Sequence, residues 1–93
     1  MTPAQSRAAR GLLNWTQSDF SQAAGVSEVT VRNFENEKSS PQRASLQVMR
    51  AALETAGVIF IAESGEGPGV RLRKDRPAAE GLKLDELSAE NDG

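Results

Sequence analysis

The sequence predicts a mainly α-helical chain of four short helices that ends in a two-stranded β-hairpin. Up to residue 56, apolar residues recur at helical spacing, and glycine or proline separates the periodic segments. After residue 57 the pattern changes to one short apolar run and one alternating run, both typical of strands. These observations divide the chain into a helical part, residues 1–57, and a hairpin part, residues 58–76.

The helices are expected at residues 3–15, 17–24, 27–36 and 42–56. Apolar residues at near-helical spacing predict the first helix, and Arg7 and Arg10 are expected on its solvent face. Thr16 is a suitable N-cap for the second helix, and Gly25 ends it.

Ser27 and Pro41 mark the beginnings of the third and fourth helices. Ser27 is a good N-cap, and Val31 and Phe34 follow three residues apart on one face of the third helix. Pro41 cannot continue a helix that it interrupts, but it can start the next one. The fourth helix then presents an apolar stripe at helical spacing.

The two strands are expected at Val58 to Ala62 and Val70 to Lys74. The first is apolar and rich in β-branched residues, whereas the second alternates apolar with basic residues. The glycine-rich segment ESGEGPG lies between them, so the strands either form an antiparallel hairpin or pair with a partner chain. Residues 77–93 are interpreted as a flexible acidic tail, which has room for a short helix on a partner through Leu82, Leu84 and Leu87.

The composition excludes several classes of function. Because the chain has no cysteine and no histidine, disulfides, thiolate zinc sites and histidine-based proton transfer are excluded. The acidic residues are scattered over helix surfaces without a glycine-rich phosphate loop beside them, so we expect no enzyme, no metal and no cofactor. The longest apolar run, residues 58–62, is too short to span a membrane. A soluble cytoplasmic protein is expected.

The net charge of −2 hides an asymmetry between the body and the tail. Residues 1–76 carry ten basic and eight acidic residues, whereas residues 77–93 carry one basic and five acidic residues. The body is therefore weakly positive, at +2, and the tail is negative, at −4. A weakly basic face remains available on the body.

The segment from Thr16 to Pro41, TQSDFSQAAGVSEVTVRNFENEKSSP, resembles the lambda-repressor-like helix-turn-helix family, also called Cro/CI or XRE-type. The resemblance covers about residues 1–56. It implies a bacterial or phage-type regulator that binds double-stranded DNA, with one helix crossing the phosphate backbone and the next in the major groove. The matching residues supply an apolar-then-small pair, a turn and an inner helix face: Phe20, Ser21, Gly25, Val26, Val31, Phe34 and Glu35.

Carried over position by position, the resemblance implies DNA contacts at Gln17, Ser27, Glu28, Val29, Arg32 and Asn33. Gln17 would bind a phosphate and brace the recognition helix; an exposed helix-starting glutamine is the alternative. Arg32 could reach a guanine or a phosphate, or stay solvated, and Asn33 could serve adenine or the backbone. After the recognition helix, four residues are placed to bind phosphates: Lys38, Ser39, Ser40 and Arg43.

Two acidic residues depart from the family pattern. Glu28 stands where an uncharged or basic residue is common, and it either accepts a hydrogen bond from cytosine or only favours the helix dipole. Glu37 stands where glycine is common, so Asn36 is expected to take the left-handed conformation instead. Val29, beside Glu28, could contact a thymine methyl group.

The hairpin is expected to form a homodimer. Strand alternation cannot place all of VIFI on one side of a sheet, so one pair of side chains stays exposed unless a second chain covers it. The alternative is a monomer in which the first helix and the tail bury both faces. The expected dimer residues are Val58, Ile59, Phe60, Ile61, Val70 and Leu72.

The basic cluster near the second strand has three interpretations. It is a solvated strand edge, a phosphate-contacting wing or a docking site for the acidic tail. Its members are Arg71, Arg73, Lys74 and Arg76.

The expected function is that of a sequence-specific transcriptional regulator. A homodimer would bind an inverted-repeat operator, and repression by promoter occlusion is the simpler mode. The alternative is a protein-binding antagonist, such as an antitoxin or antiactivator, that uses the hairpin and tail to hold a protein partner.

Overall fold

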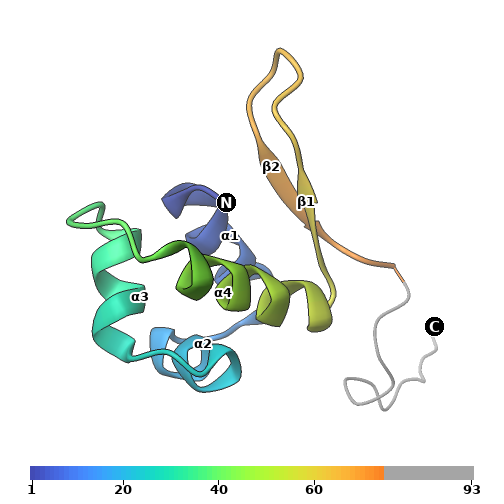
Figure 1. The fold of residues 1–93 in the computed structure, drawn as a ribbon. Helices are drawn as coiled ribbons and strands as arrows, with labels where there is room; N and C mark the ends of the chain where they lie inside the picture. The colour runs from blue at the N-terminus through green and yellow to red at the C-terminus, as the bar shows by residue number, and fades with distance from the viewer. Residues whose placement is uncertain (75–93) are drawn as a thin grey trace, which may run out of the picture.

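The computed structural model describes residues 1–74, in which four helices precede a two-stranded antiparallel sheet (Figure 1). The helices form one body, and the hairpin extends away from it with its connecting loop at the far end. The predicted fold class is confirmed, whereas the predicted tail, residues 77–93, lies outside the described residues. The elements are α1 (Pro3–Leu13), α2 (Gln17–Ala24), α3 (Glu28–Glu35), α4 (Arg43–Thr55), β1 (Val58–Ile61) and β2 (Gly69–Leu72).

Local capping explains most of the helix boundaries. At the start of α2, the Thr16 hydroxyl accepts from the Asp19 amide and the Asp19 carboxylate accepts from the Thr16 amide, both at 2.9 Å. This reciprocal pair satisfies two amides that the helix itself leaves free. The first helix ends earlier than predicted, at Leu13, because Asn14 adopts the left-handed conformation with φ 59°. Asparagine tolerates this conformation better than most residues.

The turn between α2 and α3 depends on Gly25, which has φ 74° and ψ 29°. A Cβ atom added there would meet nothing within 4 Å, so the backbone angle, and not lack of space, favours glycine at this position. Ser27 then caps α3, and its hydroxyl accepts from the Thr30 amide at 3.0 Å. The sequence prediction of a helix, a glycine turn and a serine-capped second helix is confirmed.

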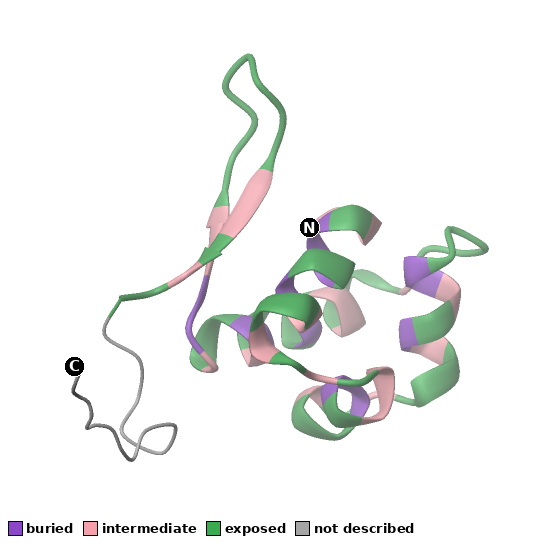
Figure 2. Ribbon diagram, turned by 180° about the vertical axis from the view of Figure 1, so that it is seen from behind, coloured by how far each residue is buried: buried purple, intermediate pink, exposed green. Residues whose placement is uncertain are grey.

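The apolar core lies where all four helices and the first strand meet (Figure 2). Helix α1 uses its apolar residues only in part: Ala9 is buried and Leu13 packs against the core, but Ala8 and Leu12 are exposed. Gln5 and Ser6 are buried beside Ala9 instead. The reason is a polar contact with α3, described below. The buried apolar residues are Ala9, Phe20, Val31, Phe34, Met49, Leu53 and Val58.

The left-handed residue after α3 is Glu37, with φ 61°, and not the predicted Asn36, which has φ −88°. The Glu37 amide donates to Phe34 O at 3.0 Å, and the Lys38 amide donates to Asn33 O at 2.8 Å. These two bonds form the Schellman arrangement, which requires a positive φ one residue after the C-cap. Because Asn36 is the C-cap, the geometry assigns that conformation to Glu37, although a side chain is disfavoured there.

The hairpin pairs Val58 with Leu72 and Phe60 with Val70, and this face packs against the helices. Three polar or charged contacts fix it to the body: Gln5 Nε2 donates to Gly69 O at 2.9 Å, Arg73 Nη2 donates to Glu54 O at 2.9 Å, and Arg50 lies 4.6 Å from the centroid of the Phe60 ring. The hairpin is therefore attached to both α1 and α4.

Within residues 1–74, the opposite face of the hairpin is not covered by the helices. Ile59 and Ile61 point away from the helices because side chains alternate along a strand, and their cross-strand partners are Arg71 and Gly69. Ile61 is 37 % exposed and Ile59 is half-buried. The alternative in which the first helix and the tail bury both faces involves residues outside the described part of the chain.

We expect Glu37→Gly to raise the free energy of unfolding by about 1 kcal/mol, because glycine removes the left-handed penalty at this position. Asn36→Gly is the matched control and should lower stability, since Asn36 has an ordinary negative φ. Urea unfolding of both variants checks this. Stabilisation by glycine at residue 36 instead of 37 would contradict the assigned geometry.

Candidate nucleic-acid interface

The outward face of α3 carries the residues predicted to read bases. Ser27, Glu28, Val29 and Arg32 are exposed, and Asn33 is half-buried. Val29 is 50 % exposed, so its apolar side chain is accessible on this face. The inward face is formed by Val31, Phe34 and Glu35, all buried, so α3 divides cleanly into a held face and a presented face.

The charged residues on the presented face of α3 have no ion-pair partner within residues 1–74. Among residues 1–74 the ion pairs are Arg10 with Glu35 and Arg50 with Glu54, so Arg32 and Glu28 have no charged partner there. Glu28 lies in the first turn of α3, where a negative charge suits the helix dipole. A cation and an apolar side chain thus stand free on one helix surface.

The residues predicted to bind phosphates follow α3 in an exposed loop and at the start of α4: Lys38, Ser39, Ser40 and Arg43. The amides of Lys38 and Ser39 both donate to Asn33 O, at 2.8 and 3.4 Å. These two backbone amides are therefore already hydrogen-bonded. An anion such as a phosphate could still bind the side chains of Lys38 and Ser39.

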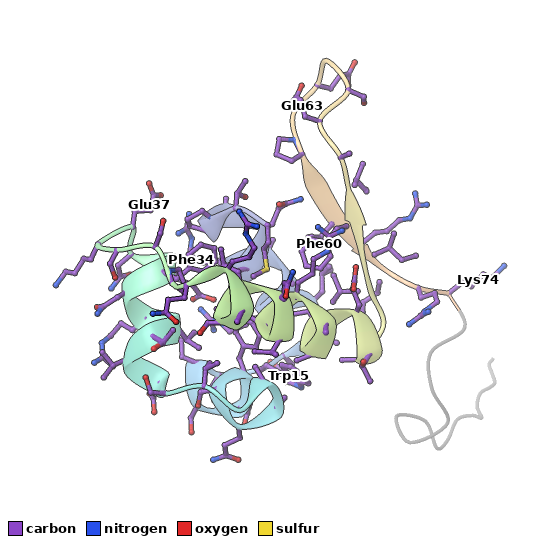
Figure 3. All side chains as sticks on the ribbon, viewed as in Figure 1. Trp15, Phe34, Glu37, Phe60, Glu63 and Lys74 are labelled. Atoms are coloured by element: carbon purple, nitrogen blue, oxygen red, sulfur yellow. The ribbon has the colours of Figure 1, made fainter. Side chains whose placement is uncertain are left out.

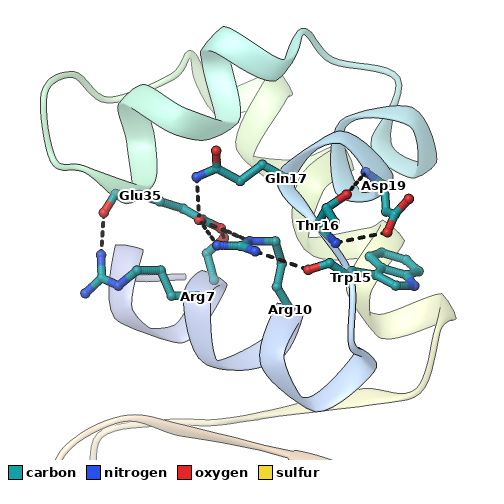
Figure 4. Close-up of polar contacts among 8 residues, drawn as sticks. Arg7, Arg10, Trp15, Thr16, Gln17, Asp19 and Glu35 are labelled. Carbon is teal, nitrogen blue, oxygen red and sulfur yellow. Dashed lines mark hydrogen bonds and ion pairs between the residues drawn. The ribbon is translucent and has the colours of Figure 1, made fainter.

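Gln17 is the first residue of α2, and its side chain is already engaged. Its Nε2 atom donates to Glu35 Oε1 at 3.1 Å, which brings the start of α2 to the end of α3 (Figure 4). The predicted bracing of the recognition helix by this residue therefore has a visible contact. One remaining Nε2 hydrogen and the backbone amide are the donors left for a phosphate.

Glu35 is the centre of a polar network that joins three helices (Figure 4). The Arg10 guanidinium donates to both carboxylate oxygens, with the shortest contact, Nη2 to Oε1, at 2.6 Å. Ser6 Oγ donates to Oε2 at 2.6 Å, and Arg7 Nη1 donates to the Glu35 carbonyl. Arg10 also donates to Trp15 O at 3.1 Å, which fixes the connection between α1 and α2.

The expectation that Arg10 faces solvent is wrong. Its side chain is 19 % exposed, and that of Glu35 is 1 % exposed. The apolar periodicity of α1 misplaced its inner face, because the network turns Ser6 inward. One signal was available in the sequence: an acid assigned to the inner face of α3 needs a basic partner, and buried charges are rarely unpaired.

The network controls the ionisation of Glu35. Burial alone would raise the pKa of this carboxyl, but hydrogen bonds from Arg10, Ser6 and Gln17, together with the Arg10 charge, outweigh burial and lower the pKa. The pKa of Arg10 is raised, chiefly by its hydrogen bond to Glu35, against the opposing effect of burial. Both groups are therefore charged over the whole neutral range, and α3 is held in place by an intact ion pair.

The predicted dimer residues divide into two sets. Val58, Phe60, Val70 and Leu72 pack against the helical core of their own chain. Ile59 and Ile61 face away from it. Of the basic cluster, Arg71 is exposed on this outer side and Arg73 contacts the end of α4, while Arg76 lies outside the described residues.

Comparison with known proteins agrees with the geometry. A helix-turn-helix family matches residues 7–56, more than half of the chain. No match was found among curated proteins. The fold and the presented helix define a helix-turn-helix DNA-binding domain.

The chain belongs to the lambda-repressor-like helix-turn-helix family, the Cro/CI or XRE type, and is a DNA-binding transcriptional regulator. This is a family of regulators and not of enzymes. Within residues 1–74, no helix combines the length and the apolar character needed to cross a membrane.

We expect Glu35→Gln to lower the free energy of unfolding at pH 7 by about 3 to 5 kcal/mol, because it leaves Arg10 largely buried without a counter-charge. The Glu35 pKa is lower in the folded chain, so its stabilisation is present above the unfolded pKa of about 4.3 and is lost as pH falls through the folded pKa. The difference from wild type should therefore narrow in acid.

Urea unfolding at several pH values measures this difference. The matched control is Glu54→Gln, which removes the exposed pair with Arg50 and should change stability by less than about 1 kcal/mol. A Glu35→Gln variant as stable as wild type at pH 7 would contradict a structural role for the network.

Proposed function

We propose that this regulator is a homodimeric repressor that reads an inverted-repeat operator with α3. The observation that carries the proposal is the presented face of α3, where exposed Val29 and Arg32 have no partner within the described chain. Buried and satisfied contacts on the opposite face hold the helix in place, so the free side chains are positioned for a ligand. In this proposal the protein acts in the cytoplasm, where it occludes promoters.

Each proposed DNA contact follows from chemistry and exposure. Arg32 suits guanine O6 and N7, Asn33 suits adenine, and Val29 suits a thymine methyl group. Ser27 and Glu28, at the start of the helix, meet bases or the adjacent backbone. The proposed phosphate contacts are Gln17, Lys38, Ser39, Ser40 and Arg43.

The charge of this surface favours a dimer. Its cations are Arg32, Lys38 and Arg43, and its anions are Glu28 and Glu37, so a single domain offers little net attraction to phosphates. Joining two domains makes the second binding event intramolecular and raises affinity without additional charge. A two-fold dimer would separate its recognition helices by about 34 Å, one turn of DNA.

The open face of the hairpin supports the proposed dimer contact. Ile59 and Ile61 lie on the side that the helices do not cover, and each strand of the two-stranded sheet has an edge with no strand beside it in residues 1–74. Pairing with a second hairpin would bury both side chains and close one edge. The inner-face residues Val58, Phe60, Val70 and Leu72 pack against the helical core and would hold the strands in position for this contact.

The same open face is the observation that favours a second candidate function, a protein-binding antagonist. In that case a different protein would cover Ile59 and Ile61. Purification of the protein from its host would distinguish the two: a stoichiometric foreign partner supports the antagonist, and a self-associated chain supports the homodimer.

Selection of bound sequences from a random DNA pool tests the proposed function directly. The expected result is an inverted repeat whose half-site centres lie about 10 base pairs apart. Recovery of a single, non-repeated site would contradict the dimeric part of the proposal. Recovery of no preferred sequence would contradict the proposed reading by α3.

We expect Arg32→Ala to cost about 1 to 3 kcal/mol of operator affinity and to relax the preference at one base pair of each half-site. Lys38→Ala, the matched control, should weaken all sequences alike and reduce the salt slope by about one unit per domain. Binding titrations on the selected operator and on single-base variants measure both. Unchanged affinity and base preference after Arg32→Ala would show that α3 is not the reading helix.

We expect Ile61→Asp to give a folded monomer whose operator affinity falls by about 100-fold or more, because the gain from joining two domains is lost. Leu12→Asp is the control, since Leu12 is 41 % exposed on α1, compared with 37 % for Ile61. Sedimentation gives the mass, and circular dichroism checks the helices. A wild-type monomer that binds its operator tightly would overturn the proposed hairpin dimer.

A further inference from the structure

An apolar groove lies between α2 and α4, on a different part of the surface from the presented face of α3. It has a volume of about 440 Å³, and charged side chains are absent from its lining. Val48, in this lining, is 45 % exposed, and Ala51 is exposed beside it. The lining residues are Trp15, Ala23, Ala24, Val48, Ala51, Ala52, Thr55 and Ala56.

We propose that the segment from Leu82 to Leu87 of the same chain docks in this groove. Its sequence, LKLDEL, places three leucines among charged residues, and residues 75–93 lie outside the described part of the structure. Most of the lining residues are alanines, whose small side chains leave room for leucine side chains. Each Å² of apolar surface removed from water would contribute about 25 cal/mol.

The chain leaves the hairpin near the C-terminal end of α4, which lines one end of the groove. The Arg73 amide donates to Gly57 O at 2.7 Å, and its guanidinium donates to Glu54 O at 2.9 Å. Both acceptors lie at the end of α4, next to the groove residues Thr55 and Ala56. The path to the docked segment therefore begins at the edge of the groove itself.

The linker is long enough to reach. Leu82 lies eight positions after Lys74, and an extended chain spans up to about 27 Å over that length. The segment that lines the groove, from Val48 in α4 to the C-cap Ala56, is only about 12 Å long at 1.5 Å per residue. A short connection also gives an effective concentration in the millimolar range, so a weak contact is sufficient for occupancy.

Charge complementarity favours the chain's own segment over a foreign partner. The segment and its flanks carry Glu80, Asp85, Glu86, Glu90 and Asp92 against Lys83. The exposed cations Arg73 and Lys74 are the last described residues, and the Arg73 guanidinium contacts Glu54 O at the end of α4. The leucines match the uncharged lining, and the acids remain at its rim beside these cations.

Trp15 gives a direct readout, because it is the single tryptophan of the chain, is half-buried, and lines the groove beside α4 (Figure 3). In the full chain its emission should be blue-shifted and protected from acrylamide. The triple substitution Leu82→Ser, Leu84→Ser and Leu87→Ser should abolish both effects without changing the circular dichroism. Identical emission and quenching in the two proteins would overturn the proposal.

A matched pair of substitutions on α4 locates the contact. Ala51→Glu places a negative charge in the groove and should cause the same loss as the leucine changes, whereas Ala44→Glu, exposed on α4 outside the groove, should not. Loss of protection with the leucine changes but not with Ala51→Glu would place the segment elsewhere and contradict the groove as its site.

Two further measurements test whether the segment binds the groove specifically and whether it does so within one chain. A peptide of residues 77–93 added to the leucine-substituted chain should restore half of the protection at about 1 mM or less, since intramolecular occupancy requires a dissociation constant below the effective concentration. Protection in the wild type should not depend on protein concentration. A concentration-dependent signal would show docking on a second copy, and failure of the peptide to restore protection would contradict a specific contact.

Discussion

The ion pair between Arg10 and Glu35 is the constraint on which the rest of the domain depends. One carboxylate receives hydrogen bonds from α1 and α2 while it belongs to the last turn of α3, so the three helices share a single buried acceptor. Val31 and Phe34 pack into the apolar core from the same inward face of α3 and fix its distance from the body. The polar network around Glu35, at the end of this face, fixes the rotation of the helix. A recognition helix needs both its distance and its rotation fixed, because a rotated helix would present different side chains to the major groove of DNA.

Local capping and turn residues made the outline of the fold predictable from the sequence. The polar contacts between residues far apart in the chain could not be predicted in this way. The caps of α2 and α3 are formed by Thr16, Gly25 and Ser27, whose contacts lie within a few residues in the sequence. The positions of these two helices could therefore be predicted from the sequence. Arg10 and Glu35 are 25 positions apart, and no apolar pattern reveals their pairing. For the same reason Gln5 and Ser6 are buried where alanine and leucine were expected, and hydrophobicity alone misplaced the inner face of α1.

The candidate interface shows the same division. The exposure of Val29, Arg32 and Lys38 agrees with what the resemblance implies, since those residues follow the helix-turn-helix frame. The engagement of Gln17 by Glu35 and the left-handed Glu37 depend on how the end of α3 meets its neighbours, which a list of matching residues does not specify. Two apolar surfaces that residues 1–74 leave uncovered, the outer hairpin face and the groove between α2 and α4, also become apparent only once the helices are packed.

The loop between β1 and β2 has a practical consequence. Every residue from 62 to 68 is exposed, and the loop lies at the end of the hairpin farthest from the helices. Its internal hydrogen bonds run from the amides of Gly65 and Gly67 to the Glu63 carboxylate and do not involve the core. Exposed loop tips of this kind tolerate inserted sequence well. This position therefore suits a genetically encoded epitope or dye-labelling tag that follows the regulator in living cells while both ends of the chain keep their native sequence.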